Sequence, residues 1–428
     1  MKKFVVILVI LLLWHIPSSF EKMSNYSRLA IVMKNEELPP PLPLNLTLEE
    51  CIAKRKSVRE FSNEEISMKE LATILWAAYG YTDKDRTIHL LANAIEIYVL
   101  TNEAVYKYDA LNHSLIFYKE GDYRKVSQYE APIQLGLVWN KSKCPDEYLA
   151  SAEIGEIGQN IYFAAVALNL GTVTTVGFSL KAIGLPPNEE PKIIMPLGYP
   201  EYPYNFEYKH WKFSNLPSIK QSSYSLQEAI EERRETKEFK GNITKQQLSQ
   251  ILWAAYGFSY YVDKVITEKN KIRRHRTVPS AHAYYPIKIY AITKEGIYRY
   301  HAGVYRYYMW NFPVLHSIIR IRKGDYRDAI SNASLAEISN APLILISVLD
   351  LRMAKGMIGL RDDFSGEQFR WLWYYEAGAS AHNVLLEATA WQLAANITMP
   401  KDSDTIRQIL NLNENFVPLL IVAVGEEN

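Results

Sequence analysis

The stretch Leu75-Trp76-Ala77-Ala78-Tyr79-Gly80 recurs in the second half of the chain as Leu252-Trp253-Ala254-Ala255-Tyr256-Gly257. Further matches flank it in the same order: Arg55 to Phe61 with Arg233 to Phe239, Gly121 to Arg124 with Gly324 to Arg327, Ala131-Pro132 with Ala341-Pro342, and Gln159-Asn160 with His382-Asn383. A separation of about 180 to 220 residues is too long for a solenoid repeat. The chain therefore contains one domain twice.

The composition fits two globular domains and excludes some partners. Of 428 residues, 48% are hydrophobic and 22% charged, which is enough apolar surface for two cores. A net charge of +1 gives no basic field, so we expect no nucleic acid partner. Cys51 and Cys144 have neither the spacing nor the neighbours of a metal site, and they could form a disulfide or stay free thiols.

The N-terminus predicts export or membrane attachment. Residues 1–23 join a basic start to a short apolar run, as in a signal peptide or membrane anchor, and residues 24–45 form a Pro-rich tether. Asn-x-Ser/Thr sequons agree with export, and they begin at Asn25, Asn45, Asn112, Asn140, Asn242, Asn332 and Asn396. We expect a secreted or membrane-anchored protein with an extracytoplasmic body.

Helices and strands are interspersed without regular βαβ order, which predicts an α+β fold. The boundaries we expect are 46–205 for the first domain, 206–221 for a linker and 222–428 for the second domain. Capping motifs predict helices from Thr47 to Lys56 and from Ser67 to Tyr79. Further expected helices cover 157–168, 226–233, 244–256 and 373–393, and expected strands cover 95–100, 133–138, 287–293, 342–349 and 417–424.

Three segments contain residues suited to chemistry. Arg55-Lys56-Ser57-Val58-Arg59 combines cations with a small hydroxyl, which suits a phosphate or an electron-rich ring edge. In Gly171-Thr172-Val173-Thr174-Thr175-Val176-Gly177 the glycines would let backbone amides approach a flat ligand, although a helix end leading into a strand is the alternative. The segment from Arg276 to Pro286 is a Pro-bounded loop that presents Ser280.

Together these segments resemble the FMN-dependent nitroreductase superfamily, most closely its SagB-type dehydrogenase branch. The resemblance rests on Arg-x-Ser-x-Arg at 55–59, the Leu-Trp-Ala-Ala-x-Gly helix end, Arg-Thr-x-Pro-Ser-Ala-x-x-x-Tyr-Pro at 276–286, Gly-Thr-Val at 171–173, and Glu376-Ala377-Gly378 before His382-Asn383. It covers about residues 46–205 and 222–427. It implies two fused nitroreductase-like (FMN-binding) domains that form an intramolecular pseudo-dimer, which we expect to be monomeric.

Members of the family hold FMN between two subunits, so the resemblance implies a composite site between the two halves. Its cofactor-binding residues would be Arg55, Lys56, Ser57, Arg59, Gly171, Thr172, Val173 and Gly177 from the first half, and Pro279, Ser280 and Ala281 from the second. By the same resemblance, Arg55 and Ser57 would hold the phosphate and ribityl side, and Arg59 the N1/C2 edge. Amides near Gly171 would face N5, and Ser280 would fix the ring.

The mirror-image site lacks all three parts. Glu235 replaces the serine and would repel a phosphate. The counterpart of the glycine segment, Ala394 to Pro400, contains no glycine, and Arg86 to Asn93 is a shorter loop without Pro-Ser. We therefore predict one working flavin site per chain. His282 is a candidate proton donor near this site, although a loop histidine is more often structural or solvated. Glu376 and His382-Asn383 fit buried helix packing better than catalysis.

The resemblance implies an FMN-dependent oxidoreductase that acts on a small organic or peptide-derived substrate. Azoline-type oxidation and reduction of a nitro compound or quinone with NAD(P)H both remain open. The alternative is a degenerate flavin-binding or scaffold protein of the cell envelope without turnover, because one whole site has been lost. FMN is made in the cytosol, so an exported body would capture FMN outside, or else the N-terminal segment anchors a body that faces inward.

Overall fold

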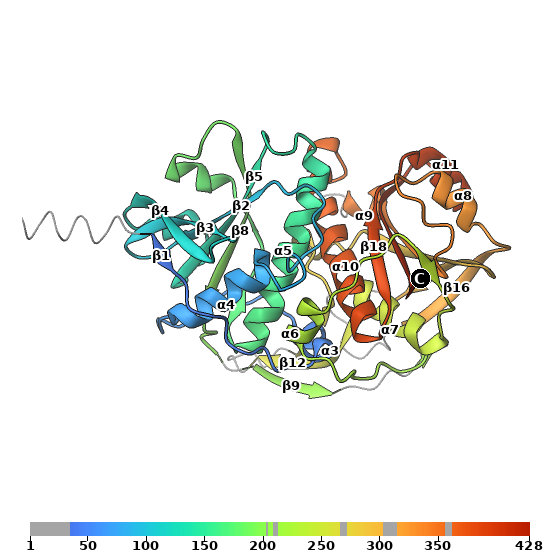
Figure 1. Cartoon of the computed structure of the whole chain (residues 1–428), viewed down its shortest axis with the longest axis horizontal. Coiled ribbons are helices and arrows are strands. Elements are labelled where there is room, and N and C mark those ends of the chain that lie inside the picture. The colour runs from blue at the N-terminus through green and yellow to red at the C-terminus, as the bar shows by residue number, and fades with distance from the viewer. Residues whose placement is uncertain (1–34, 203, 209–212, 266–271, 303–314, 356–361) are drawn as a thin grey trace, which may run out of the picture.

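The chain folds into two similar halves that pack against each other (Figure 1). The computed structural model describes residues 35–202, 204–208, 213–265, 272–302, 315–355 and 362–428. The signal peptide or anchor expected at 1–23 lies outside the described residues. Among those that are described, no helix is long and apolar enough to cross a membrane.

Each half contains a large, mostly antiparallel sheet. The first consists of β1 (Glu36–Glu37), β2 (Ile95–Leu100), β3 (Ala104–Asp109), β4 (Ser114–Glu120), β5 (Ile133–Asn140), β6 (Gly171–Thr172), β7 (Thr175–Val176) and β8 (Glu189–Gly198). The second consists of β10 (Phe213–Ser214), β11 (Phe239–Lys240), β14 (Ile287–Thr293), β15 (Gly296–His301), β16 (Leu315–Lys323), β17 (Leu343–Asp350), β18 (Ala394–Thr398) and β19 (Phe416–Glu427). Their orders, β4-β3-β2-β5-β8 and β16-β15-β14-β17-β19, are equivalent. The α+β prediction and the internal repeat are therefore confirmed.

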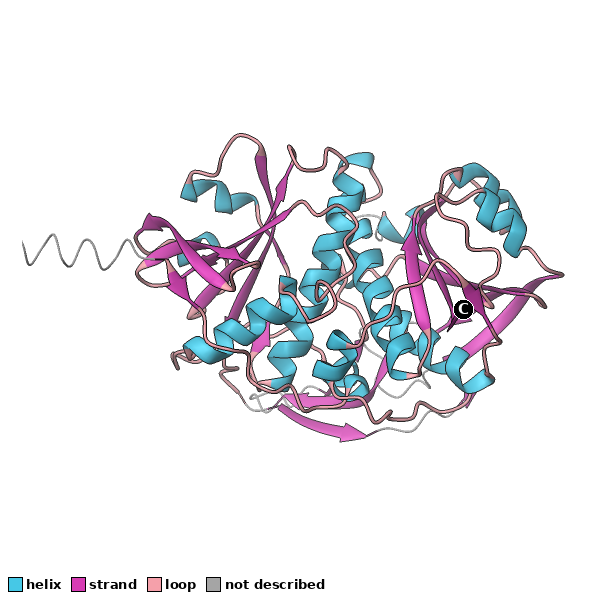
Figure 2. Cartoon of the chain, in the orientation of Figure 1, coloured by secondary structure: helices cyan, strands magenta, loops and turns pink. Residues whose placement is uncertain are grey.

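The helices are α3 (Leu48–Lys54), α4 (Met68–Tyr79), α5 (Glu147–Ala167), α6 (Leu226–Glu231), α7 (Lys245–Tyr256), α8 (Arg327–Asn332), α9 (Leu351–Ala354), α10 (Arg370–Ala390) and α11 (Ser403–Ile409). Most of them lie between the two sheets, whereas α8 and α11 pack on the outer face of the second sheet (Figure 2). The Ser67 capping box that starts α4 and the Gly80 that ends it are both present. One continuous hydrophobic core includes buried residues of both halves.

The two halves meet where α5 crosses α10. A Cβ added at Gly155 would lie 2.1 Å from the carbonyl oxygen of Tyr375, and one added at Gly378 would lie 2.0 Å from that of Ala152. Glycine is thus required at both positions, because a side chain would hold the helices apart. Helix α5 begins at Glu147, ten residues before the expected start at Ile157, because Asp146 caps it by accepting from the amides of the next turn.

Segments expected to be a tether and a linker contribute to the fold. From residue 36 the expected tether packs on the first domain, since β1 pairs with β4 and Leu44 is fully buried. Around the expected linker, β9 (Tyr204–Tyr208) pairs with β12 (Phe258–Val265), which also pairs with β13 (Ile272–Arg276). These strands cross from one half to the other along one side of the molecule (Figure 1). Cys51 and Cys144 are both free thiols.

Candidate functional site

Arg55 connects the first half to the loop of the second half. It caps the C-terminus of α3 and is buried, with its guanidinium over the ring of Tyr162 at 4.9 Å. Its Nε and Nη2 donate to the carbonyl oxygen of Arg276 at 3.3 and 3.1 Å. Its Nη1 is buried without a hydrogen-bond partner among the described residues. This leaves one charged donor available at the junction of the halves.

Tyr162 on α5 joins the first two predicted segments. Its hydroxyl oxygen accepts from the amide of Thr174 at 2.9 Å and lies 3.4 Å from Ser57 Oγ. The amide of Val58 donates to the carbonyl oxygen of Thr172 at 2.9 Å. The structure therefore places Ser57 beside the segment from Gly171 to Gly177, as a shared site requires.

The glycines of that segment have a structural reason that the sequence does not show. A Cβ at Gly171 would lie 2.6 Å from the side chain of Val58, and one at Gly177 would lie 2.9 Å from the backbone of Ile193. Both glycines therefore permit close packing within the first half. Thr172 and Val173 are buried, and Thr172 Oγ1 has no hydrogen-bond partner among the described residues.

Helix α10 and its neighbouring loop complete the site from the second half. The hydroxyl of Tyr375 lies 2.7 Å from Thr174 Oγ1, so α10 contacts the first half's segment directly. The adjacent Glu376 is fully buried and accepts from Ser280 Oγ at 2.6 Å and from the Tyr256 hydroxyl. Burial raises the pKa of Glu376 to about 7, although both hydroxyl donors oppose this shift. This carboxyl therefore holds its proton more strongly than an exposed glutamate does.

The loop that presents Ser280 has a strained backbone. His282, Ala283 and Tyr285 have φ values of 50°, 56° and 50°, which non-glycine residues rarely adopt. Each costs on the order of 1 kcal/mol, and such strain is typical of functional sites. The amide of Tyr285 donates to Ser280 Oγ at 2.9 Å and holds this conformation. In the aligned loop of the first half only Asn93 has a positive φ.

The remaining candidate residues differ in their burial and in their contacts. Arg59 is exposed, and no hydrogen bond or ion pair among the described residues joins it to the other candidates. Lys56 is nearly buried, with Nζ 4.6 Å from the ring centroid of Phe206. Pro279 is buried and Ala281 is half-buried. His282 is exposed, and its ring stacks on Phe364 at 4.8 Å.

Comparison with known proteins shows the family to which this chain belongs. Residues 52–199 and 230–426 each match the Nitroreductase family. The chain belongs to this family. The two matches confirm that the nitroreductase domain occurs twice, and they place the chain in a family of oxidoreductases.

The chain is also similar to individual proteins. This chain is 31% identical over 181 residues to a candidate nitroreductase of Methanocaldococcus jannaschii. The match covers 36% of this chain and 91% of the relative. A candidate nitroreductase from Anabaena variabilis has a similar fold, with a TM-score of 0.63 and 14% identity over 91% of this chain and 94% of its own. One from Desulfovibrio desulfuricans, solved in complex with FMN, is 19% identical over 36% of this chain and 86% of its own, with a TM-score of 0.28.

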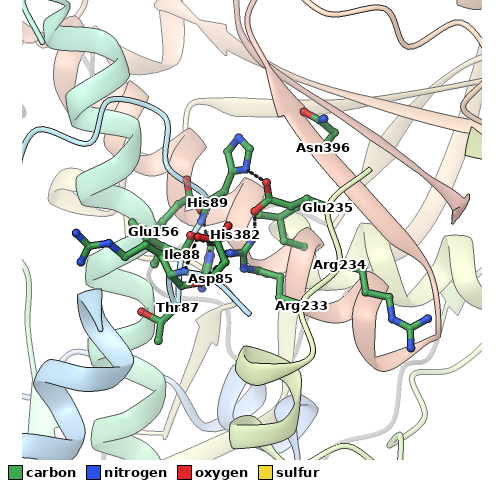
Figure 3. A network of polar contacts seen from close by, with 12 residues as sticks. Asp85, Thr87, Ile88, His89, Glu156, Arg233, Arg234, Glu235, His382 and Asn396 are labelled. Atoms are coloured by element: carbon green, nitrogen blue, oxygen red, sulfur yellow. Dashed lines mark hydrogen bonds and ion pairs between the residues drawn. The ribbon is translucent and has the colours of Figure 1, made fainter. Parts of the chain in front are cut away.

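At the mirror-image position, this nitroreductase-family chain contains a network of its own charged side chains (Figure 3). Arg233 Nη2 donates to the carbonyl oxygens of Arg86 and Ile88, each at 2.9 Å, as Arg55 does to Arg276. Its Nη1 forms an ion pair with Glu235. The other carboxylate oxygen of Glu235 lies 2.6 Å from His89 Nδ1. The cation that corresponds to Arg55 is therefore neutralised within the protein.

The groups behind this network are also buried and titratable. His382 contacts Glu156 Oε2 at 3.1 Å and Asn160 Oδ1 at 2.7 Å. Burial, followed by the Arg233 cation, lowers the pKa of His89 to about 4 and that of His382 well below its ordinary value. Burial raises the pKa of Glu156 well above its usual range. Arg234 points away from the network (Figure 3).

Proposed function

We propose that this chain is an FMN-dependent oxidoreductase with one composite flavin site between its two halves. The observation that supports this most is the pair of buried polar groups without partners, Arg55 Nη1 and Thr172 Oγ1, beside the half-buried Ser57. A charged donor and two hydroxyls suit the oxygen-rich phosphate and ribityl groups of FMN. The donor set of the composite site therefore fits the cofactor that the family resemblance implies.

In this proposal FMN supplies the hydride chemistry, and the protein binds and orients it. Arg55, Ser57 and Thr172 would hold the phosphate and ribityl side, and Ser280 would contact the ring from the second half. Arg59 lies at the exposed rim, where a cation favours a negatively charged ligand. Tyr162 holds Thr174 and Ser57 together within the first half, and Tyr375 joins Thr174 to the second half.

The mirror-image position does not bind FMN in this proposal. Glu235 occupies the place of Ser57 and already neutralises Arg233. The Glu235 carboxylate would repel a phosphate at this position, and the Arg233 cation is already neutralised by its ion pair. The mirror-image position also lacks the glycine segment and the Pro-Ser loop of the composite site.

Bound cofactor per chain tests the proposal. Full-length protein purified in mild detergent should be yellow, or should become yellow with added FMN, and should release about one FMN per chain. Protein that takes up no FMN would contradict the flavin site, and two FMN per chain would contradict the single-site claim. Steady turnover of a quinone or nitro compound with NAD(P)H then distinguishes an oxidoreductase from a flavin-binding scaffold.

The substrate, location and oligomeric state are also proposals. We propose a small organic or peptide-derived substrate, a monomeric chain, and a membrane-anchored or secreted protein with an extracytoplasmic body. Protease protection in intact cells tests the location, and sedimentation of the purified chain tests the monomeric state. One observation limits the case for export, because Asn140 of one sequon is buried and donates to Glu96, so the folded protein cannot be glycosylated there.

A further inference from the structure

The two halves contain the same buried glutamate in different surroundings. Glu153 on α5 and Glu376 on α10 are equivalent, and each accepts from the equivalent tyrosine, Tyr79 or Tyr256. Glu153 also accepts directly from three backbone amides, those of Ala92, Asn93 and Ala94, at 2.6, 2.7 and 3.3 Å. It therefore holds the loop of the first half in place by ordinary carboxylate capping.

In the second half a hydroxyl is inserted between the loop amide and the carboxylate. The amide of Tyr285 donates to Ser280 Oγ, and Ser280 Oγ donates to Glu376 Oε2. Glu376 receives no backbone amide of the loop among the hydrogen bonds of the described residues; its partners there are two hydroxyls. Ser280 is half-buried while Glu376 is fully buried, so the serine connects an enclosed carboxyl to the accessible side of the site.

This arrangement lets the protonation state of Glu376 set the direction of the Ser280 hydroxyl. Since Ser280 Oγ accepts from the Tyr285 amide, its own proton points to Glu376 when that carboxyl is ionised. When Glu376 is protonated, the carboxyl can donate to Ser280 Oγ, and the serine proton is then free to point outward. No equivalent hydroxyl separates Glu153 from its loop.

We propose that Glu376 is an internal proton donor for the composite site and that Ser280 transfers its proton. The inference rests on the proposed oxidoreductase function and extends it to the proton that must accompany hydride transfer. As the O–H bond of the Glu376 carboxyl breaks, a bond forms to Ser280 Oγ. The original Ser280 O–H bond breaks in the same step, and its proton passes to the oxygen of a quinone or nitro substrate, which becomes basic as hydride is added. Glu376 is left ionised, and no electrons move in this step.

The surroundings of Glu376 support a carboxyl that exchanges a proton near neutral pH. Burial favours its neutral form and is opposed by hydrogen bonds from Ser280 and Tyr256 and by the cation of Arg276. Arg276 lies over the ring of Tyr285 at 5.2 Å and donates to the Tyr256 carbonyl oxygen at 2.9 Å. Burial raises the pKa of Tyr256 well above its ordinary value, so this tyrosine keeps its proton and does not compete.

Infrared titration of the full-length protein without FMN tests the protonation itself. In difference spectra, one carbonyl component of a protonated carboxylic acid should be lost with a midpoint near pH 7; this component should be absent in Glu376→Gln and should remain in the matched control Glu153→Gln. Burial also raises the pKa of Glu156 and of Glu387, and these two carboxyls contribute a background that is common to all the variants. Ser280→Ala should keep the Glu376 component, because the carboxyl stays in place. A component that is unchanged in Glu376→Gln would overturn the inference.

The second measurement uses the FMN-loaded protein, NAD(P)H and a quinone. The kcat of the unmutated protein should fall above about pH 7, as Glu376 ionises. Glu376→Gln and Ser280→Ala should each lower kcat by about 100-fold and remove this pH dependence, and the double variant should be no worse than either alone. Glu153→Gln should lose stability but keep the pH profile.

The outcomes separate this inference from the function on which it rests. If the unmutated protein binds no FMN, the proposed function is wrong and the proton transfer is overturned with it. If FMN binds normally and Glu376→Gln keeps the pH profile, only the inference is overturned. A loss of the profile in Glu153→Gln as well would also overturn it, because the effect would then not be specific to the second half.

Discussion

Arg55 and Arg233 occupy equivalent places and donate to equivalent carbonyl oxygens, yet different side chains face them. Beside Arg55 stands Ser57, and one guanidinium nitrogen has no partner among the described residues. Beside Arg233 stands Glu235, which forms an ion pair with the same nitrogen. The two halves therefore share the backbone arrangement around the arginine, but they differ in whether the charge of that arginine is available to a ligand. The residue aligned at 57 and 235, together with the glycine segment and the Pro-Ser loop, distinguishes the two positions, whereas the fold does not.

The largest effect is expected when Ser57 is replaced by the glutamate that occupies the equivalent place in the second half. Ser57→Glu should weaken FMN binding by about a thousandfold, or about 4 kcal/mol, because a carboxylate would pair with Arg55 and repel the phosphate. Fluorescence titration with FMN measures this loss. Ser57→Ala is the matched control and should cost about tenfold at most, since it removes one hydroxyl without adding charge. Equal losses in the two variants would contradict the assignment.

A second difference concerns pH. Glu376 holds its proton more strongly in the folded chain than in the unfolded one, so its contribution to stability is present at low pH and is lost as pH rises from about 4.5 through about 7. The free energy of unfolding of the unmutated protein, relative to Glu376→Gln, should fall by about 3 kcal/mol between pH 4 and pH 8. Urea unfolding at a series of pH values measures it. A constant difference would show that this carboxyl ionises normally.

The mirror-image position should respond in stability and not in binding. Glu235→Ser removes the partner of a buried cation and should destabilise the fold by about 2 kcal/mol, less than a fully buried pair would because Glu235 is partly exposed. The number of FMN molecules per chain should stay at one. Urea unfolding and flavin release measure the two quantities. A second bound FMN would mean that the carboxylate alone had closed this site.

The smallest effect is expected at the unpaired hydroxyl of the composite site. Thr172→Val keeps the shape of the side chain and removes the buried Oγ1. FMN affinity should fall by about fivefold, or about 1 kcal/mol, whereas protein without FMN should be slightly more stable. Calorimetric titration and thermal unfolding check the two signs. Unchanged affinity would place Thr172 outside the site.

The sequence predicted the repeat, the α+β class and most helices because these depend on local signals. Capping boxes and glycine ends mark α4, and they hold in the structure. The early start of α5 was missed although Asp146 is a typical N-cap residue. Gly155, which lies inside this helix, has no local reason in the sequence. Its reason is the crossing with α10, which only the tertiary structure reveals. The pairing of β9 with β12 likewise joins segments with no local signal of partnership.

The sequence predicted which segments form the candidate site, but it did not predict what each residue does there. Arg55, Ser57 and the segment from Gly171 were expected together, and the structure brings them together through Tyr162. The proton-donor role proposed for Glu376 was not predicted, since the same glutamate occurs in both halves and was expected to pack in a buried helix. Only the loop conformation distinguishes the two copies. The repeated Tyr79 and Tyr256, each of which donates to the glutamate of its own half, were the available signal.

The crossing of α5 and α10 has a consequence for how the protein behaves on dilution. A site built by two separate chains falls apart when the chains dissociate, so its ligand is lost at low concentration. Here both walls belong to one polypeptide, and each is present for the other at a fixed effective concentration. Dilution of the protein therefore cannot separate the two walls of the proposed site. FMN should leave a dilute chain only through its own binding equilibrium, and added FMN should restore the complex at any protein concentration.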